Sequence, residues 1–304
     1  MPEVAVHAVY SRKQETGDTF AGKHNIANVY TDYEEFLQSD IDAVYIATPT
    51  YAHCPQALKA MEYKKHVLCE KIMAVNEKEA SEMFRCAQKN EVVLLEAMRP
   101  DFDPAFDLVK EHLRKIGKLR RVTLEYCQYS SRYNRFRQGE VLNAFNPELS
   151  NAAIMDIGVY CIHTLVRLLG MPEEIKAFST KLKNGFEGSG VVLMQYHDMM
   201  AEAIYSKITD SVNSSIFLGE EGSILIEGVA KPQSVEIIYR DGRREKISYT
   251  PAGNNMVYEL REFARLISEK CTRHPYREYS LDTARVVDEA RRQNGIVFQA
   301  DAVL

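Results

Sequence analysis

The sequence lacks the marks of several large classes of protein. Basic residues are not in excess, since 38 Lys and Arg stand against 43 Asp and Glu and the net charge is −5. This balance argues against a broadly basic nucleic-acid-binding protein and against a polybasic membrane-surface protein. No apolar run approaches the ~18 residues that span a bilayer, and the N-terminus has neither the basic nor the apolar region of a signal peptide. We therefore expect no nucleic-acid partner and no membrane partner.

Cysteine is also scarce, and its spacing fits no metal site. The six cysteines contain no C-x-x-C pair and no pattern typical of a disulfide framework; they are Cys54, Cys69, Cys86, Cys127, Cys161 and Cys271. We expect reduced thiols, no bound metal and a cytoplasmic location.

The length predicts more than one domain. There are 304 residues and no tryptophan, but 17 Tyr and 12 Phe supply large side chains for a core. At roughly 150 residues each, this length favours about two domains.

Residues 1–97 alternate strand-like and helix-like segments. Apolar segments typical of buried strands occupy residues 4–10, 43–47, 66–69 and 92–95. Helical patterns lie between them, over residues 31–38, over residues 55–64 and after Asn76, which precedes Glu79 as in a capping box. This alternation predicts a parallel sheet with helices on both faces.

Residues 98–304 have a different pattern. Helices are predicted from Asp103 to near Gly117, over about residues 152–169, over residues 256–270, and from a cap at Ser280 to Gly295. Strand-like segments joined by short turns occupy residues 122–129, 174–180, 191–196, 201–208, 215–218, 223–226 and 235–239. The second half is therefore predicted to be an α+β domain with a mainly antiparallel sheet.

Polar side chains follow the first predicted parallel strand. Open α/β sheets bind ligands at the carboxyl ends of their strands. Ser11 and Arg12 end this strand, where a dinucleotide-binding fold contacts the adenosine ribose, and the pair suits a 2′-phosphate. The pattern favours NADP over NAD, and the alternative is an ordinary surface arginine.

Two more polar groups follow the next predicted strands. Thr48, Pro49 and His53 belong to the run ATPTYAH, a rigid loop that could border a cofactor or could simply form a helix-capping turn. Glu70 and Lys71 come directly after residues 66–69. A partly desolvated lysine there could be tuned toward neutral pH as an acid or base, or could bind a substrate hydroxyl. The alternative is a solvated lysine, the usual fate of this residue.

The predicted helix over residues 152–169 is apolar around most of its surface. Its polar residues fall on one narrow stripe; they are Asp156, Tyr160, His163, Thr164 and Arg167. A helix this apolar is largely buried, so the stripe should face a cavity, a polar network or a narrow strip of solvent. Asp156 and Tyr160 lie one turn apart and could point at the same small molecule. The alternative is a partly exposed helix whose polar face meets water.

The segment YCQYSSRYNRFR, residues 126–137, places three arginines among four aromatic residues. Such a pattern can stack on single-stranded nucleic acid or contact an anion. Because the segment is short and the net charge is negative, we expect a solvated loop or a contact between subunits.

Three runs, in this order and spacing, resemble the Gfo/Idh/MocA oxidoreductases. They are ATPTYAH, HVLCEKI and FNPELSNAAIMDIGVYCIH. Tyr160 stands where many members have His, which makes the sequence more similar to the glucose–fructose oxidoreductase and dihydrodiol dehydrogenase branch. The resemblance implies a Rossmann-like dinucleotide-binding domain over residues 1–97. Over residues 98–304 it implies an α+β domain whose large, open-faced sheet binds substrate and pairs subunits in a homodimer or higher oligomer.

The resemblance also implies an activity, that of a dehydrogenase that uses NADP, or NAD, on a hydroxyl of a sugar, polyol or cyclic diol. Lys71 and Asp156 would bind and polarise this substrate, and Tyr160 would take the alcohol proton while hydride passes to the nicotinamide. The residues implied to border the cofactor are Ser11, Arg12, Thr48, Pro49, His53, Glu70 and Lys71.

The sequence departs from the family pattern in four places. Thr50 replaces an Asn, Ile72 replaces a Pro, the pair Asn151-Ala152 replaces a Gly-rich pair, and no G-x-G-x-x-G is present. The sequence begins MPEVAVHAVYSR, one strand–helix unit later than the family does, so we expect an N-terminally truncated Rossmann-like sheet, roughly 30 residues short, whose strands lack a central neighbour. Two hypotheses follow: a dehydrogenase whose printed sequence lacks this unit, or a redox-inactive member that acts as a ligand-binding or oligomeric scaffold.

Overall fold

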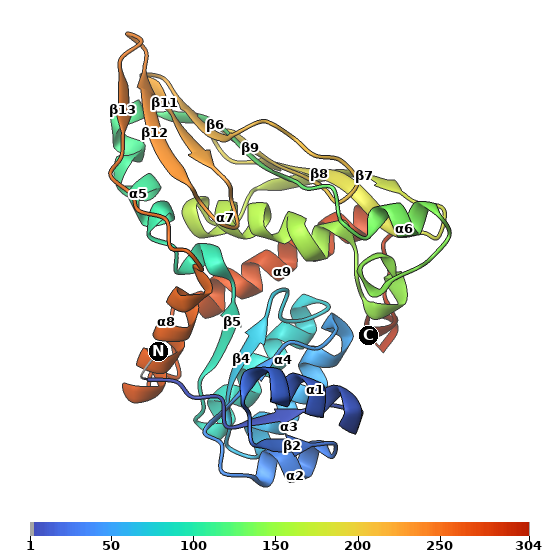
Figure 1. Cartoon of the computed structure of the whole chain (residues 1–304). Helices are drawn as coiled ribbons and strands as arrows, with labels where there is room; N and C mark the ends of the chain where they lie inside the picture. The colour runs from blue at the N-terminus through green and yellow to red at the C-terminus, as the bar shows by residue number, and fades with distance from the viewer. Residues whose placement is uncertain (1–2, 304) are drawn as a thin grey trace.

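The computed structural model describes residues 3–303, which form two lobes (Figure 1). The first lobe, blue to teal, contains short parallel strands with helices around them. The second, green to orange, is built on a large twisted sheet. Residues 4–7 are not part of the first strand, so the strand predicted over 4–10 is correct only in its second half.

The first lobe has the predicted alternation of strands and helices, but its parallel strands form two sheets rather than one. β1 (Ala8–Tyr10) pairs with β2 (Asn28–Tyr30), and β3 (Ala43–Ile46) pairs with β4 (His66–Glu70), which pairs with β5 (Leu94–Ala97). The helices are α1 (Gln14–His24), α2 (Tyr33–Gln38), α3 (His53–Glu62) and α4 (Glu77–Asn90). The predicted cap of α4 is confirmed, since the Asn76 side chain accepts a hydrogen bond from the Glu79 backbone at 3.0 Å.

The second lobe contains an eight-stranded sheet in the order β13-β12-β11-β10-β6-β9-β8-β7. Every neighbouring pair is antiparallel except β6 and β9, which are parallel. The strands are β6 (Leu119–Cys127), β7 (Glu174–Lys181), β8 (Glu187–Gln195), β9 (Met200–Ser206), β10 (Ser215–Gly219), β11 (Gly222–Glu227), β12 (Ser234–Tyr239) and β13 (Arg244–Lys246). The predicted class, a parallel Rossmann-like region followed by a mainly antiparallel sheet, is confirmed.

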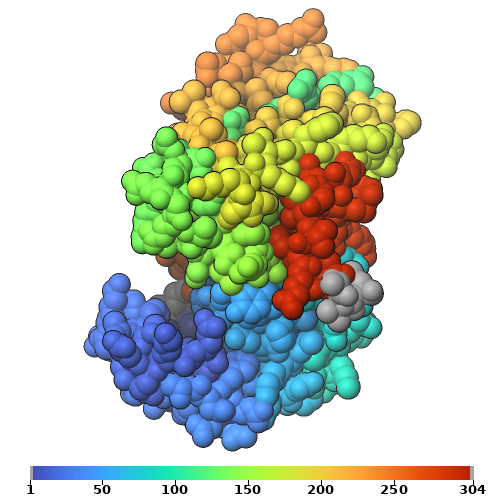
Figure 2. Space-filling view, turned by 90° about the vertical axis from the view of Figure 1, so that its right-hand side faces the viewer, coloured from blue at the N-terminus to red at the C-terminus, as the bar shows by residue number. Residues whose placement is uncertain are grey.

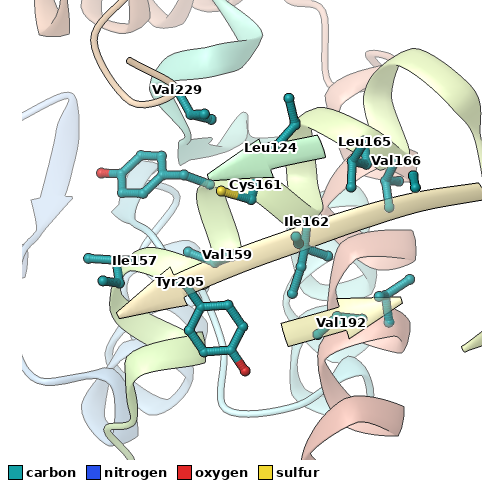
Figure 3. Packing of buried hydrophobic residues seen from close by; sticks show 14 of the residues in the cluster. Leu124, Ile157, Val159, Cys161, Ile162, Leu165, Val166, Val192, Tyr205 and Val229 are labelled. Carbon is teal, nitrogen blue, oxygen red and sulfur yellow. The ribbon is translucent and has the colours of Figure 1, made fainter. Parts of the chain in front are cut away.

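The main core lies between this sheet and two helices, α7 (Val159–Leu169) and α9 (Tyr276–Gln293). Figure 3 shows apolar residues of α7 meeting side chains of the sheet, among them Val192 and Tyr205. Alternate residues of each strand point into this core, as burial on one face of a sheet requires.

The C-terminal helices also pack against the first lobe. α8 (Met256–Ser268) contacts β5, and α9 contacts β5 and α4, so residues far apart in sequence form one junction. Ser280 was predicted to cap the last helix, but it lies inside α9, where its hydroxyl donates a 2.6 Å hydrogen bond to the buried carboxylate of Glu96. Serine often caps helices, which favoured the prediction, but here its hydroxyl binds a carboxylate from another part of the chain. Of the helices within residues 3–303, none is both long enough and apolar enough to cross a membrane.

The helix predicted over residues 152–169 is not a single α-helix. Residues Ile154–Gly158 form a π-helical turn, and the α-helix proper begins at Val159. Gly158 sits at the join, where a β-carbon would lie 2.8 Å from the ring of Tyr205 on β9. The turn is therefore pressed against the sheet at a point that admits no side chain. Shorter elements complete the fold: α5 (Pro104–His112) and α6 (Tyr133–Arg137).

Candidate active site

A cavity of about 650 Å³ lies between the two lobes. On one side are the loops that follow β3 and β4, and on the other is the segment that leads into the π-helical turn. Figure 2 shows the recess between the blue first lobe and the green segment of the second. Its lining residues are Ala47, Thr48, Pro49, Thr50, His53, Glu70, Lys71, Arg132, Arg135, Leu142, Asn143, Ala144, Leu149, Asn151, Met155 and Asp156.

His53 ties the two loops of the first lobe together. It begins α3 and is only 2% exposed, and its two ring nitrogens contact the carbonyl oxygens of Thr48 at 2.7 Å and of Ile72 at 3.0 Å. Burial lowers the pKa of His53, although both carbonyls act in the opposite direction. Because both nitrogens are engaged, His53 shapes the cavity wall by positioning the loops.

Glu70 and Lys71 end β4 at the edge of the cavity. The carboxylate of Glu70 accepts hydrogen bonds from the Tyr45 hydroxyl and, at 3.2 Å, from the Lys71 backbone. The peptide bond between Lys71 and Ile72 is cis. The Lys71 side chain extends from the end of β4 to the second lobe, where its ammonium contacts Asp156.

Lys71 and Asp156 form the ion pair that joins the lobes at the cavity. The Lys71 Nζ donates to Asp156 Oδ1 at 2.9 Å and to the Asp156 backbone oxygen at 2.5 Å. Burial acts to lower the pKa of Lys71, but the negative charge of Asp156 outweighs it and raises that pKa. The prediction that Lys71 is tuned toward neutral pH is therefore wrong, because the charge of the Asp156 carboxylate outweighs the effect of burial on the pKa of Lys71.

Asp156 has a second cationic partner, Lys207, which the sequence did not predict. The Lys207 Nζ lies 2.7 Å from Asp156 Oδ2. Burial acts to raise the pKa of Asp156, but the two ammonium groups dominate and lower it. The side chain of Asp156 is 39% exposed, whereas those of Lys71 and Lys207 are 13% and 5% exposed. Of the three groups, the carboxylate is thus the one most open to the cavity.

Tyr160 lies behind Lys71 rather than in the cavity wall. The Lys71 Nζ is 5.0 Å from the centre of the Tyr160 ring, within cation–π range. The ring of Tyr126 packs edge-on against the Tyr160 ring at 5.8 Å. Tyr160 is 5% exposed, and burial raises the pKa of its phenol although Lys71 opposes this. The structure therefore brings the three predicted catalytic residues together, with Tyr160 the most enclosed.

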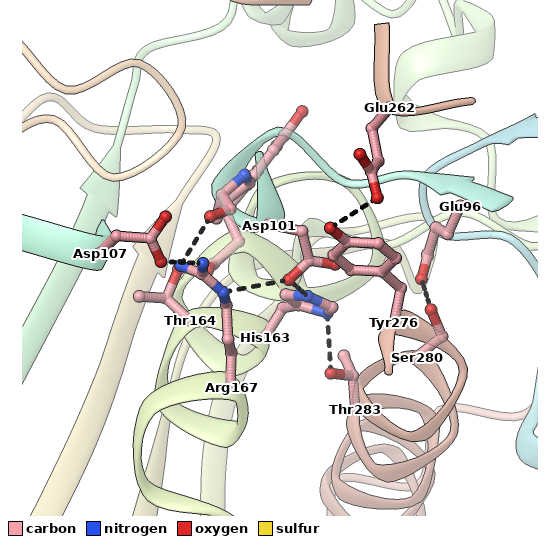
Figure 4. Close-up of polar contacts among 12 residues, drawn as sticks. Glu96, Asp101, Asp107, His163, Thr164, Arg167, Glu262, Tyr276, Ser280 and Thr283 are labelled. Carbon is pink, nitrogen blue, oxygen red and sulfur yellow. Dashed lines mark hydrogen bonds and ion pairs between the residues drawn. The ribbon is translucent and has the colours of Figure 1, made fainter. Parts of the chain in front are cut away.

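The rest of the predicted polar stripe faces a different place. His163 is fully buried and bridges the Asp101 carboxylate, at 2.8 Å, and the Thr283 hydroxyl, at 3.0 Å (Figure 4). The Arg167 guanidinium donates to Asp107 at 2.6 Å. The Thr164 hydroxyl donates to the Tyr160 carbonyl at 2.8 Å. The polar stripe therefore contacts two different places. Asp156 reaches the cavity from the π-helical turn, whereas His163 and Arg167 lie farther along the α-helix, at the junction of the lobes.

Ser11 and Arg12 lie apart from this cavity. They follow β1, and the Ser11 hydroxyl donates to the Lys13 carbonyl at 3.0 Å. Arg12 is exposed, and no ion pair to its side chain is found within residues 3–303. Their place at the carboxyl end of a parallel strand is as expected, but they do not line the recess.

Other residues of the site were not anticipated. Arg132 and Arg135 lie in the segment over residues 126–137, for which a solvated loop or a subunit contact was expected, and both line the cavity. Lys207 had a signal in the sequence. It continues the alternation of buried residues at 201, 203 and 205 on β9, which places a lysine in phase with core positions.

Comparison with known proteins agrees with this architecture. Residues 1–98 match the profile described as an oxidoreductase family with an NAD-binding Rossmann fold, and residues 107–225 match the GFO/IDH/MocA C-terminal domain. The chain is 48% identical to the scyllo-inositol 2-dehydrogenase (NADP(+)) IolU of Bacillus subtilis, over 97% of this chain and 90% of that one. It is 29% identical to the trans-1,2-dihydrobenzene-1,2-diol dehydrogenase of Danio rerio, over 98% and 91%.

A solved structure shares the fold. The 3-ketoreductase KijD10 from Actinomadura kijaniata, in complex with NADP and TDP-benzene, superposes with a TM-score of 0.84 at 23% identity, covering 95% of this chain and 89% of that one. The two-lobed arrangement, the two matching profiles and the 48% identity lead to one conclusion. The chain belongs to the Gfo/Idh/MocA oxidoreductase family.

Proposed function

We propose that the protein is an NADP-dependent dehydrogenase that oxidises a hydroxyl group of a polyol, sugar or cyclic diol, with NAD as a less favoured cofactor. The observation that carries this proposal is the Lys71–Asp156 ion pair at the cavity, which Thr48 and Pro49 also line. Relatives support the substrate class, since one is named for scyllo-inositol and NADP(+) and another for a dihydrodiol. The solved neighbour was crystallised with NADP.

The residues present fit part of such a cofactor, although the sequence has no G-x-G-x-x-G loop for its pyrophosphate. Thr48, Pro49, Glu70 and Lys71 line the cavity at the carboxyl ends of β3 and β4, where open α/β sheets bind dinucleotides. Arg12 follows β1 and is exposed, so its guanidinium suits a 2′-phosphate. His53 would act indirectly, by fixing the Thr48 carbonyl. When bound, the cofactor would supply or accept the hydride.

The protein's own groups have complementary tasks. Lys71 is protonated, so its ammonium would donate a hydrogen bond to the substrate oxygen and stabilise negative charge there. Asp156 is ionised and open to the cavity, so it would accept a hydrogen bond from a substrate hydroxyl and orient it. Tyr160 is a neutral phenol beside Lys71, and we assign to it the transfer of the hydroxyl proton.

The test separates binding from chemistry. NADPH and NADH binding would be measured by fluorescence titration, followed by turnover with a panel of inositols, sugars and cyclic diols. Lys71→Met, Asp156→Asn and Tyr160→Phe should each lower kcat/KM by about 100-fold or more while changing the NADPH Kd little. NADPH binding without turnover on any of these substrates would instead support a redox-inactive, ligand-binding member. Absence of binding would overturn the proposal.

Three broader features belong to the same proposal. We infer a domain boundary near Ala97, where β5 ends, and a cytoplasmic location, supported by six free cysteine thiols. We also infer a homodimer or higher oligomer formed through the sheet face opposite α7 and α9, where Phe178 and Met200 are 65% and 37% exposed. Sedimentation at several concentrations tests the assembly, and charged substitutions at Phe178 should weaken it.

A further inference from the structure

Lys207 is an unusual lysine for its position. It follows β9 at the edge of the core, and its side chain is only 5% exposed. Its ammonium donates to Asp156 Oδ2 at 2.7 Å and to the Ala144 carbonyl at 2.7 Å. The rings of Phe145 and Phe186 face it at 5.1 and 5.2 Å. Hydrogen-bond acceptors and ring faces therefore surround it, which leaves little of the ammonium open to a substrate.

Stability alone does not explain this lysine. Removing a charge from water is costly, and a buried ion pair often contributes no more to stability than apolar residues of similar size. The aromatic neighbours would accept a methionine at this place. A buried lysine that reaches a carboxylate on the cavity wall therefore points to a role in the site.

The geometry shows what Lys207 does to Asp156. The two carboxylate oxygens are divided between two lysines from different lobes: Lys71 from the end of β4 holds Oδ1, and Lys207 from the end of β9 holds Oδ2. A carboxylate held at both oxygens cannot rotate freely. Lys207 also donates to the Ala144 carbonyl, so it links Asp156 to the segment before the π-helical turn, which lines the same side of the cavity.

We propose that Lys207 is a positioning residue, which fixes one oxygen of Asp156 so that the other faces Lys71. Its positive charge also offsets part of the negative charge of Asp156, so that Asp156 binds the Lys71 ammonium less strongly than it would alone. The effect of this role on turnover rests on the proposed function. Its effect on the protonation of Lys71 does not depend on activity. Lys71 faces the charged or titratable groups Asp156, Tyr160 and Glu70, and Lys207 faces Asp156, Lys71 and Arg132.

These neighbours determine the direction in which removing Lys207 changes the protonation of Lys71. Lys207 repels the positive charge on Lys71 and shares its counter-ion. Without Lys207, Asp156 would hold the Lys71 proton more firmly, so the neutral amine would become rarer at any given pH. A merely structural lysine would change stability but not the protonation of Lys71.

The experiment measures Lys71 directly. Wild type and variants would be treated with acetic anhydride at about pH 9, below the ordinary lysine pKa of about 10.4, and Lys71 acetylation would be quantified by mass spectrometry relative to exposed lysines. Lys207→Met should lower Lys71 reactivity on the order of 3- to 10-fold. Lys207→Arg should restore most of it. The matched control is Lys183→Met, because Lys183 is an exposed lysine over Phe136 in the same aromatic cluster and should have no effect.

A second background makes the result decisive. In Asp156→Asn, adding Lys207→Met should lower Lys71 reactivity less than it does beside the intact carboxylate, because only the direct repulsion between the two ammonium groups is then lost. Equal or higher reactivity in Lys207→Met than in wild type would overturn the proposal, as would a decrease of the same size in the Asp156→Asn background. In turnover assays the alkaline limb of kcat/KM should move to higher pH in Lys207→Met. If wild type has no activity, the proposed function fails, yet the labelling still decides the role of Lys207.

Discussion

Glu187 provides the sharpest prediction about stability. It is 1% exposed on β8, and its carboxylate accepts hydrogen bonds from the Tyr205 hydroxyl at 2.8 Å and from the Ile154 backbone at 2.7 Å. Burial raises the pKa of Glu187 to about 7 from an ordinary 4.5, in spite of these two donors. Because Ile154 begins the π-helical turn that carries Asp156, this buried acid lies directly beneath the candidate site.

The sign and size of its effect follow from proton linkage. Between pH 4.5 and 7 the folded chain holds a proton on Glu187 that the unfolded chain has lost. The free energy of unfolding therefore has a contribution that is largest at low pH and decreases as the pH rises through this window. A shift of about 2.5 units corresponds to about 3 kcal/mol in total, of which roughly 2–3 kcal/mol falls between pH 5 and pH 8.

The assay is urea unfolding at pH 5 and pH 8. Wild type should lose about 2–3 kcal/mol more than Glu187→Gln between these two pH values, because an amide does not titrate. Glu259 and Asp288, whose pKa values burial raises to about 8 and about 6, titrate in the same direction but cancel in this comparison. Glu111→Gln, which removes an exposed carboxylate, should behave like wild type. If Glu187→Gln retains the full pH dependence of wild type, Glu187 does not titrate with a raised pKa in the folded chain, contrary to this prediction.

Three further predictions concern packing, the buried network and cofactor choice. Gly158→Ala should lower the free energy of unfolding in urea by about 1–3 kcal/mol, because the new β-carbon would lie 2.8 Å from an aromatic ring. The control Gly253→Ala, whose β-carbon would have no neighbouring atom within 4 Å, should change it little. Equal stability of the two variants would contradict the packing at Gly158. His163→Ala should lower stability by roughly 1–3 kcal/mol, because buried Asp101 loses a hydrogen-bond partner; an unchanged Tm would show that the network is dispensable. Arg12→Ala should weaken NADPH binding by roughly tenfold and NADH binding much less; equal weakening in the two titrations would remove Arg12 from the 2′-phosphate site.

Much of the fold could be predicted from local patterns. Apolar segments such as residues 43–47 and 66–69 predicted the parallel strands β3 and β4 to within a residue, because buried strands need continuous apolar runs. The cap at Asn76 was correct because its hydrogen bond to Glu79 joins residues three apart. The cap at Ser280 was wrong because its partner, Glu96, is distant in sequence and no local pattern reports it.

The candidate site was predictable in part. Lys71, Asp156 and Tyr160 were suggested by strand ends, by a helical stripe and by resemblance to a family, and the structure places them together. The polar residues of that stripe were expected to share one environment. Instead His163 turns to Asp101 and Thr283, because the helix crosses from the cavity wall into the junction between the lobes.

Periodicity and side-chain type along the chain predicted most of the strands and helices, and resemblance to a family suggested Lys71, Asp156 and Tyr160 as candidate catalytic residues. How their charges are shared depends on contacts that form only in the folded chain. Lys71 was expected to be a tuned acid or base, a ligand of a substrate hydroxyl or a solvated lysine, and the approach of Asp156 from the other lobe made it an ion-pair partner. Lys207 lay within a strand predicted over residues 201–208, and folding placed its ammonium 2.7 Å from the same carboxylate. Electrostatic environment depends on distance in space, which residue order does not specify.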